Sequence, residues 1–259
     1  MIVGSFAKFG KHMESFYDLL ASVDKLGVLF DIPTERRDGM LAFGQAGPAK
    51  VDLRAVSYTW PDQAFSMEEI DAQIEAGETV AILGEAGSGK SALIDVIYGL
   101  RKPTAGYLTI DGFDPRDLRP DILRSRVALA RGSEIFNATV EENVQLHREG
   151  INSTEVRDVL DAVGLLEPIL RLRDGCNTRL ASDGSLLSDK QQRLLGIARA
   201  AIGSPGLLLI DGTLDALGDT DLERCLNYLL SPEQPWTLIV ATSRRDIAAH
   251  FNDTIMLQG

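Results

Sequence analysis

Gly84-Glu85-Ala86-Gly87-Ser88-Gly89-Lys90-Ser91 fits the pattern G-x-x-x-x-G-K-[S/T], which is typical of a loop that binds phosphate. Its glycines let backbone N–H groups crowd around a polyphosphate without side-chain clash. A helix that starts here also points its free N–H groups and positive dipole end at the anion. We expect Lys90 to reach the β- and γ-phosphates of a nucleotide and the Ser91 hydroxyl to ligate Mg²⁺. The alternative is a Gly-rich turn that matches the pattern by chance.

The residues around this loop favour the phosphate-binding interpretation. Residues 79–83 are apolar and predict a buried strand that leads into the loop. Residues 92–100 predict a helix that leads out of it and stops near Pro103. Strand, loop and helix in this order form the setting that such a loop requires.

Composition limits the class of protein. The 259 residues are 44% hydrophobic, enough for one large domain or for one domain with an appendage. The net charge of −12 argues against a nucleic-acid partner, because phosphate backbones bind to basic surfaces. Cys176 and Cys225 are far apart and His12, His147 and His250 are scattered, so no metal site is predicted and a reduced, cytosolic chain is expected. We find neither an apolar run of membrane-spanning length nor a signal peptide.

The first thirty residues carry apolar side chains at helical spacing, from Val3 to Phe30, and Pro33 should end this helix. The helix either lies on its own domain or continues from a part of the protein outside this sequence. Residues 34–49 are charged and contain glycine, which is typical of a linker.

Several segments downstream predict strands. Residues 51–60 alternate as a strand. Residues 66–69 resemble a helix-capping box, but Ile70, Ala72 and Ile74 alternate and Gly77 follows at once, so a strand is predicted here instead. Strands are also predicted at 107–110 and 127–130, and continuous apolar strands at 207–211 and 238–242. Apolar strands separated by helices indicate a parallel sheet covered on both faces, with ligands at the carboxyl ends of its strands. Residues 137–199 are predicted to be mostly helical, with Gly150 and Gly175 as breaks.

Asp211 ends one of these apolar strands. An aspartate in this position, downstream of a phosphate loop, typically supplies a carboxylate for the nucleotide's Mg²⁺. Alone, such an aspartate is more often a helix cap, but the upstream loop favours the metal role.

From residue 51 to residue 259, the order of motifs resembles the nucleotide-binding domain of ABC transporters of the exporter type. Residues 56–60 resemble the strand that ends in an aromatic residue stacked on adenine, which would be Trp60. Residues 135–144 resemble the stretch that receives the coupling helices of the transmembrane domain. Residues 174–188 resemble the run into the signature motif, and residues 197–200 resemble the helix after it.

The resemblance implies an α/β fold: a P-loop NTPase core with a mixed, mostly parallel sheet and a helical subdomain at about 132–200. Residues 47–259 would be the nucleotide-binding domain. Residues 1–46 would be a helix and linker that continue from an absent transmembrane domain of the same parent chain. ATP and Mg²⁺ are the implied cofactors, and a second nucleotide-binding domain, identical or different, is the implied partner. The fragment itself would be soluble, as part of an integral membrane protein at the cytoplasmic face.

The sequence departs from the family pattern at four motifs. Arg131 stands where the family has a glutamine that touches Mg²⁺. The signature, normally Leu-Ser-Gly-Gly-Gln, is here Leu187-Ser188-Asp189-Lys190-Gln191, so both glycines are lost. Gly212 replaces the catalytic glutamate and Ser243 replaces the switch histidine. His250 is no substitute, because it lies seven residues further on in a predicted helix.

The binding parts are therefore kept, in Trp60, residues 84–91 and Asp211, whereas no catalytic position is intact. We interpret the chain as a domain that binds ATP and hydrolyses it poorly. Alternatives are an active ABC ATPase with unusual substitutions and a soluble regulatory P-loop protein without a transporter. For Arg131, we expect the guanidinium either to point away or to meet the γ-phosphate and partly replace Mg²⁺, because it cannot ligate a cation.

Overall fold

The computed structural model describes residues 2–32, 38–40, 46–60, 66–146, 148, 150–182 and 184–257. The chain divides into two compact units, Met1–Arg37 and Asp38–Gly259, which we take separately. Pro33, at which the first helix is predicted to end, lies outside the described residues, and so does most of the predicted linker.

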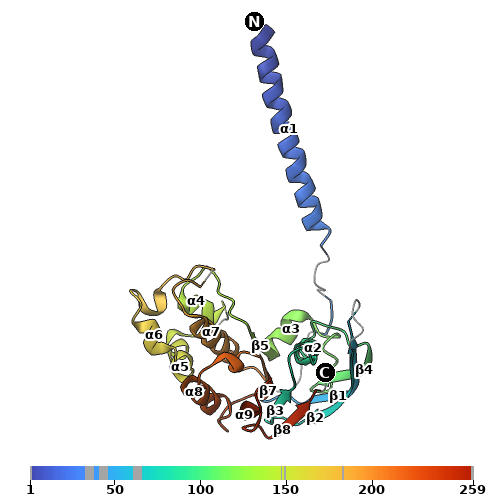
Figure 1. The fold of residues 1–259 in the computed structure, drawn as a ribbon, viewed down its shortest axis with the longest axis vertical. Helices are drawn as coiled ribbons and strands as arrows, with labels where there is room; N and C mark the ends of the chain where they lie inside the picture. The colour runs from blue at the N-terminus through green and yellow to red at the C-terminus, as the bar shows by residue number, and fades with distance from the viewer. Residues whose placement is uncertain are drawn as a thin grey trace. The chain divides into compact units, whose positions relative to one another are not determined.

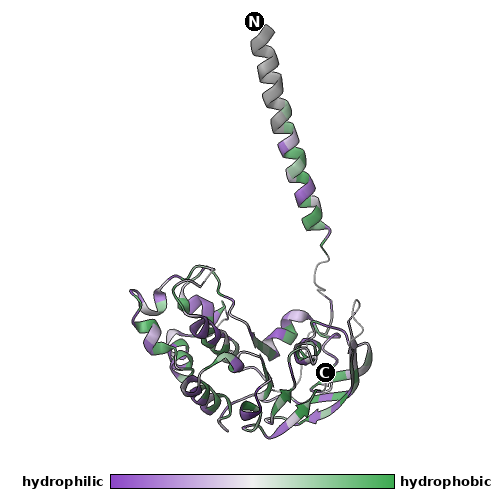
Figure 2. Cartoon of the chain, viewed as in Figure 1, coloured by the Kyte–Doolittle hydropathy of each residue, from purple (hydrophilic) through white to green (hydrophobic). Residues whose placement is uncertain are grey.

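The first unit contains a single described helix, α1 (Ile2–Phe30), where the apolar spacing predicted one (Figure 1). Large apolar side chains along it are exposed, among them Phe16, Tyr17, Leu20 and Phe30. The described part of α1 is largely hydrophobic, with a few hydrophilic residues between (Figure 2). Among the helices that the structure describes, α1 included, none combines the length and the apolarity that crossing a membrane requires.

The described residues of the second unit form two sheets. The antiparallel sheet has the order β2-β1-β4, with β1 (Val51–Thr59), β2 (Ser66–Ile74) and β4 (Ala105–Ile110). The parallel sheet has the order β5-β6-β7-β3-β8, with β3 (Thr79–Leu83), β5 (Val127–Arg131), β6 (Leu207–Asp211), β7 (Thr237–Thr242) and β8 (Asp253–Met256). The predicted α/β class is confirmed, but the strands form one parallel sheet and one antiparallel sheet rather than a single mixed sheet.

Helices connect these strands. They are α2 (Lys90–Ile97), α3 (Pro120–Arg126), α4 (Val140–Gln145), α5 (Ser153–Ala162), α6 (Leu166–Leu170), α7 (Asp189–Ala201), α8 (Asp219–Leu229), α9 (Arg245–Ala248) and the 3₁₀ turns η1 (Gly175–Asn177) and η2 (Leu214–Ala216).

Three sequence predictions about helices need correction. The described residues between 171 and 188 contain no α-helix, so the segment 137–199 is helical only in part; Gly175 and Gly184 adopt positive φ there, which favours turns. The helix after the loop runs over Lys90–Ile97 rather than 92–100, because Gly99 at φ +77° ends it. His250 lies beyond the end of α9 and is not helical.

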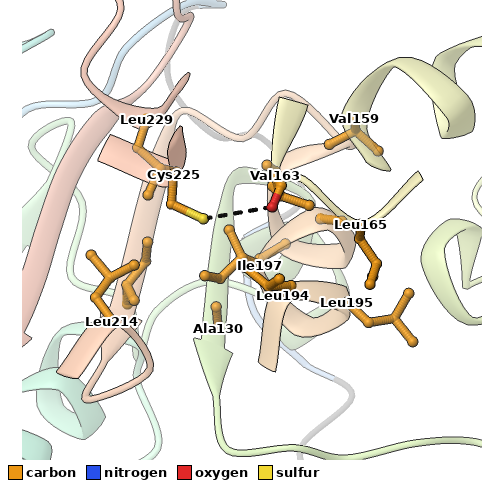
Figure 3. Packing of buried hydrophobic residues seen from close by; sticks show 14 of the residues in the cluster. Ala130, Val159, Val163, Leu165, Leu194, Leu195, Ile197, Leu214, Cys225 and Leu229 are labelled. Carbon is orange, nitrogen blue, oxygen red and sulfur yellow. Dashed lines mark hydrogen bonds between the residues drawn. The ribbon is translucent and has the colours of Figure 1, made fainter. Parts of the chain in front are cut away.

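Alternate residues of the parallel strands enter two separate cores, one on each face of the sheet. On β6 and β7, Leu208 and Val240 belong to the core that includes buried residues of α5, α7 and α8, whereas Leu209 and Ile239 belong to the core that includes α2 and the antiparallel sheet. In the first core, the thiol of Cys225 on α8 points towards Val163 O at 4.0 Å (Figure 3). Both faces of the sheet are therefore covered, and the open positions are at its strand ends.

Candidate nucleotide-binding site

The loop of residues 84–91 joins the end of β3 to the start of α2 (Figure 1). Gly87 and Gly89 have φ of +89° and +93°, a region that side-chain-bearing residues rarely adopt. A Cβ on Gly84 would lie 2.8 Å from Leu257 O and would clash with the Ser88 hydroxyl. Conformation and space therefore require glycine at these three positions.

Lys90 folds back over the loop. Its Nζ donates to Gly84 O at 2.8 Å and to Glu85 O at 2.6 Å, while Glu85 and Ala86 are exposed at the crest of the loop. Ser88 is buried, and its Oγ has no hydrogen-bond partner among the described residues. A buried hydroxyl without a hydrogen-bond partner carries a desolvation cost.

Trp60 lies over the same loop. Its ring stands edge-on to Tyr58, with the ring centroids 5.0 Å apart, and a Cβ placed on Gly89 would lie 3.6 Å from Trp60 Cη2. The structure thus brings the predicted aromatic residue, at the end of β1, next to the predicted phosphate loop. An aromatic face beside a phosphate loop suits the stacking of a nucleotide base.

Asp211 and Ser91 are also brought together, as expected. Ser91 Oγ donates to Asp211 Oδ1 at 3.1 Å, and the Asp211 side chain is only 8% exposed. Arg131 is the register partner of Asp211 on the neighbouring strand, and its Nε donates to Asp211 Oδ2 at 2.7 Å. The Arg131 guanidinium therefore does not point away; it lies among the groups predicted to face the metal.

A buried carboxylate on α2 holds the other side of this guanidinium. Asp95 Oδ1 lies 2.7 Å from Arg131 Nη1 in an ion pair that lacks hydrogen-bond alignment. Asp95 Oδ2 accepts from Arg101 Nε at 2.7 Å, and Arg101 Nη1 donates to Tyr58 Oη at 2.7 Å. These bonds raise the pKa of Arg101, chiefly through Asp95. Sequence reasoning missed Asp95 and Arg101, although an aspartate inside an otherwise apolar helix is a signal that could have drawn attention.

The signature residues contact their own helix and its neighbour. Ser188 and Gln191 form a capping box at the start of α7: Ser188 Oγ accepts from Gln191 N at 3.3 Å, and Gln191 Oε1 accepts from Ser188 N at 2.8 Å. Asp189 pairs with Arg193, and the ammonium of Lys190 lies 2.7 Å from Asp221 on α8; Leu187 is buried. The carboxylate of Asp189 thus places a negative charge at the N-terminal, positive end of the α7 dipole.

The two remaining positions that the family resemblance predicts as catalytic, Gly212 and Ser243, lie at the ends of β6 and β7. Gly212 has φ +63°, and a Cβ there would meet nothing within 4 Å. Ser243 is exposed, and Asp215 Oδ2 accepts from its Oγ at 2.7 Å and from its N at 2.8 Å. Asp215 belongs to η2, and it also accepts from the Thr242 hydroxyl.

The donor set does not suit a divalent cation well. Both oxygens of Asp211 are already engaged, and one of them by a guanidinium that repels cations. Within the described ranges, no cluster of three or more His, Cys, Asp or Glu side chains could hold a metal ion.

The phosphate loop on a parallel sheet, with an antiparallel sheet beside it, defines a P-loop nucleotide-binding fold of the ABC type. Residues 67–214 match the family model described as ABC transporter, and the chain belongs to this family. The predicted family is confirmed, and so is the prediction that the chain is an ATP-binding domain of this family.

Relatives support the same assignment. The chain is 32% identical over 244 residues to an ATP-dependent lipid A-core flippase of Chromobacterium violaceum, covering 93% of this chain and 41% of that protein. It is 30% identical over 242 residues to an uncharacterized ABC transporter ATP-binding protein, YfiB, of Bacillus subtilis, covering 92% of this chain and 42% of that protein. The chain thus spans about two fifths of the curated relatives it matches.

A solved structure of a bacterial Atm1-family ABC exporter with ATP bound has the same fold. It superposes with a TM-score of 0.79 at 24% identity, over 92% of this chain and 42% of that chain.

Proposed function

We propose that the chain is the ATP-binding domain of an exporter-type ABC transporter, and that ATP binds with its base against Trp60 and its phosphates on residues 84–91. The observation that carries this proposal is the position of the Lys90 ammonium. It is held by two loop carbonyls that a polyphosphate can replace, 2.8 and 2.6 Å away. The aromatic ring of Trp60 next to Gly89 gives the base a surface at the other end.

Mg²⁺ is the second cofactor expected from the family. Ser91 and Asp211 are the residues that would hold it, and a bound ion would neutralise charge on the β- and γ-phosphates. The guanidinium of Arg131 already occupies one oxygen of Asp211, so these two residues do not form a complete site for the ion.

We further propose that hydrolysis is impaired. Gly212 has no side chain that could accept a proton from attacking water, and the short Ser243 hydroxyl is occupied by Asp215. A positioned general base is typically worth about 10²–10⁴ in rate. Turnover by this domain should therefore be at or near background.

The partners of this domain follow from the family. A second nucleotide-binding domain would pair with it head to tail, and this closure would move attached membrane domains between access states. Its own signature, Leu187 to Gln191, would contribute poorly to the partner's site, because Asp189 places a negative charge there. Residues 1–46 would lead from the transmembrane domain at the cytoplasmic face of the membrane, and residues 47–259 would form the nucleotide-binding domain.

The test of binding uses tryptophan fluorescence. The chain has two tryptophans, and Trp236 is buried against Tyr228, which makes it a matched control. Adding ATP should change the emission; Trp60→Ala should abolish most of the change, and Trp236→Phe should preserve it. Lys90→Ala should weaken binding, because it removes a cation facing two phosphates. Unchanged affinity in both Trp60→Ala and Lys90→Ala would refute the proposed site.

The test of hydrolysis is phosphate release by the purified chain at saturating Mg-ATP and high protein concentration. The alternative, a fully active ATPase, predicts turnover on the order of one per second, at the low end for working enzymes, that Lys90→Ala abolishes. The proposed function predicts no release above that of the Lys90→Ala variant.

A further inference from the structure

We propose that the Arg131 guanidinium is a resident cation at the phosphate end of this site, and that it lets the chain bind ATP with little dependence on a divalent metal. The inference rests on the proposed ATP site and concerns how the charge of the phosphates is balanced there.

Arg131 is fixed on three sides at the carboxyl end of β5. Its Nε donates to Asp211 Oδ2 at 2.7 Å, its Nη1 lies 2.7 Å from Asp95 Oδ1, and its Nη2 lies 3.3 Å from the carbonyl oxygen of Ser91. Ser91 directly follows Lys90 in the phosphate loop. The guanidinium therefore lies beside the loop, and its position is set by β6 and α2 rather than by its own flexible side chain.

The cluster is electrically balanced without a metal ion. Two carboxylates, Asp95 and Asp211, contact two guanidiniums, Arg101 and Arg131. A bound divalent cation would add two positive charges next to the positively charged guanidinium of Arg131. The Asp211 carboxylate, which would have to offset those charges, is 8% exposed and already shared between Arg131 and Ser91.

Arg131 is also accessible enough to meet an anion. Its side chain is 36% exposed, whereas Asp95 and Asp211 are only 11% and 8% exposed. The two carboxylates are therefore buried, and the guanidinium of Arg131 is the more exposed group of the three. Arginine forms paired hydrogen bonds with phosphate oxygens, which suits this role. Asp95 is buried against Arg131, and it acts as a positioning residue for that guanidinium.

The experiment measures ATP affinity calorimetrically on the 259-residue chain, once with Mg²⁺ and once with a chelator. For the wild-type chain, we expect the two dissociation constants to agree within about threefold. Arg131→Gln places a neutral group there and frees an oxygen of Asp211, so its affinity should be higher with Mg²⁺ than with the chelator by about tenfold or more. Arg131→Lys keeps the charge and should remain close to the wild type.

The Asp95→Asn variant tests whether Asp95 positions Arg131 for ATP binding or only stabilises the fold. It should reduce the affinity in chelator more than the affinity with Mg²⁺, whereas Asp161→Asn, which removes an exposed carboxylate paired with Arg224, should change neither. A wild-type chain that loses ATP binding about a hundredfold in chelator would overturn the inference and leave the proposed ATP site standing. A chain that binds ATP under neither condition would instead refute the proposed site itself.

Discussion

Replacing Asp95 by Asn should lower the free energy of unfolding by about 2 kcal/mol. The carboxylate is 11% exposed and contacts two guanidiniums at 2.7 Å, those of Arg101 and Arg131. Removing one partner of a fully buried ion pair costs about 3–5 kcal/mol, and an exposed pair contributes about 0–1 kcal/mol. The arginine side chains are 39% and 36% exposed, so water solvates them once the carboxylate is lost, and the cost falls between the two limits.

The measurement is denaturant unfolding followed by circular dichroism, together with thermal unfolding. A loss of about 2 kcal/mol should lower the melting temperature by about 4–8 °C for a domain of this size. Asp161→Asn is the matched control, because it makes the same chemical change in a pair that is 3.1 Å long and 65% exposed on the carboxylate side. We expect that control to stay within about 0.5 kcal/mol of the wild type.

An Asp95→Asn variant as stable as Asp161→Asn would refute this reasoning. It would mean that the two guanidiniums do not stabilise Asp95, and that α2 does not position Arg131.

Three further predictions concern catalysis, pH and the fold. Gly212→Glu combined with Ser243→His should raise phosphate release only modestly, because the signature stays degenerate; full recovery of turnover would contradict this. Burial raises the pKa of Cys225 from 9.0 to about 12, so the stability from keeping this thiol protonated is complete below pH 9 and is lost as the pH rises towards 12. Between pH 8 and pH 10, the free energy of unfolding should therefore fall by about 1.4 kcal/mol less in a Cys225→Ala variant than in the wild type, as measured by denaturant unfolding. Gly106→Ala should cost several kcal/mol, roughly 3 or more, because φ is +75° and the new Cβ would clash with Ala55 O; near-wild-type melting would show that β4 can shift.

The sequence by itself determined the phosphate loop and the class of fold. Gly84, Gly87 and Gly89 are required by conformation and close contact within one short segment, so their spacing carries the whole signal. The strands β6 and β7 are buried on both faces and therefore appear as unbroken apolar runs. In contrast, β8 escaped prediction: it is partly exposed and begins with Asp253, so it has no apolar run to reveal it.

Only the tertiary structure decided what surrounds Arg131. Asp95, Arg131 and Asp211 come from a helix and two strands, separated by 36 and 80 residues along the chain, and no periodicity connects them. The sequence allowed the guanidinium either to point away or to face the phosphates. Parallel pairing of β5 with β6 places Arg131 opposite Asp211, and the packing of α2 brings Asp95 to its other side. Charges so distant in sequence become partners only when the sheet register brings them together in a partly buried place, where an unpaired charge would be costly.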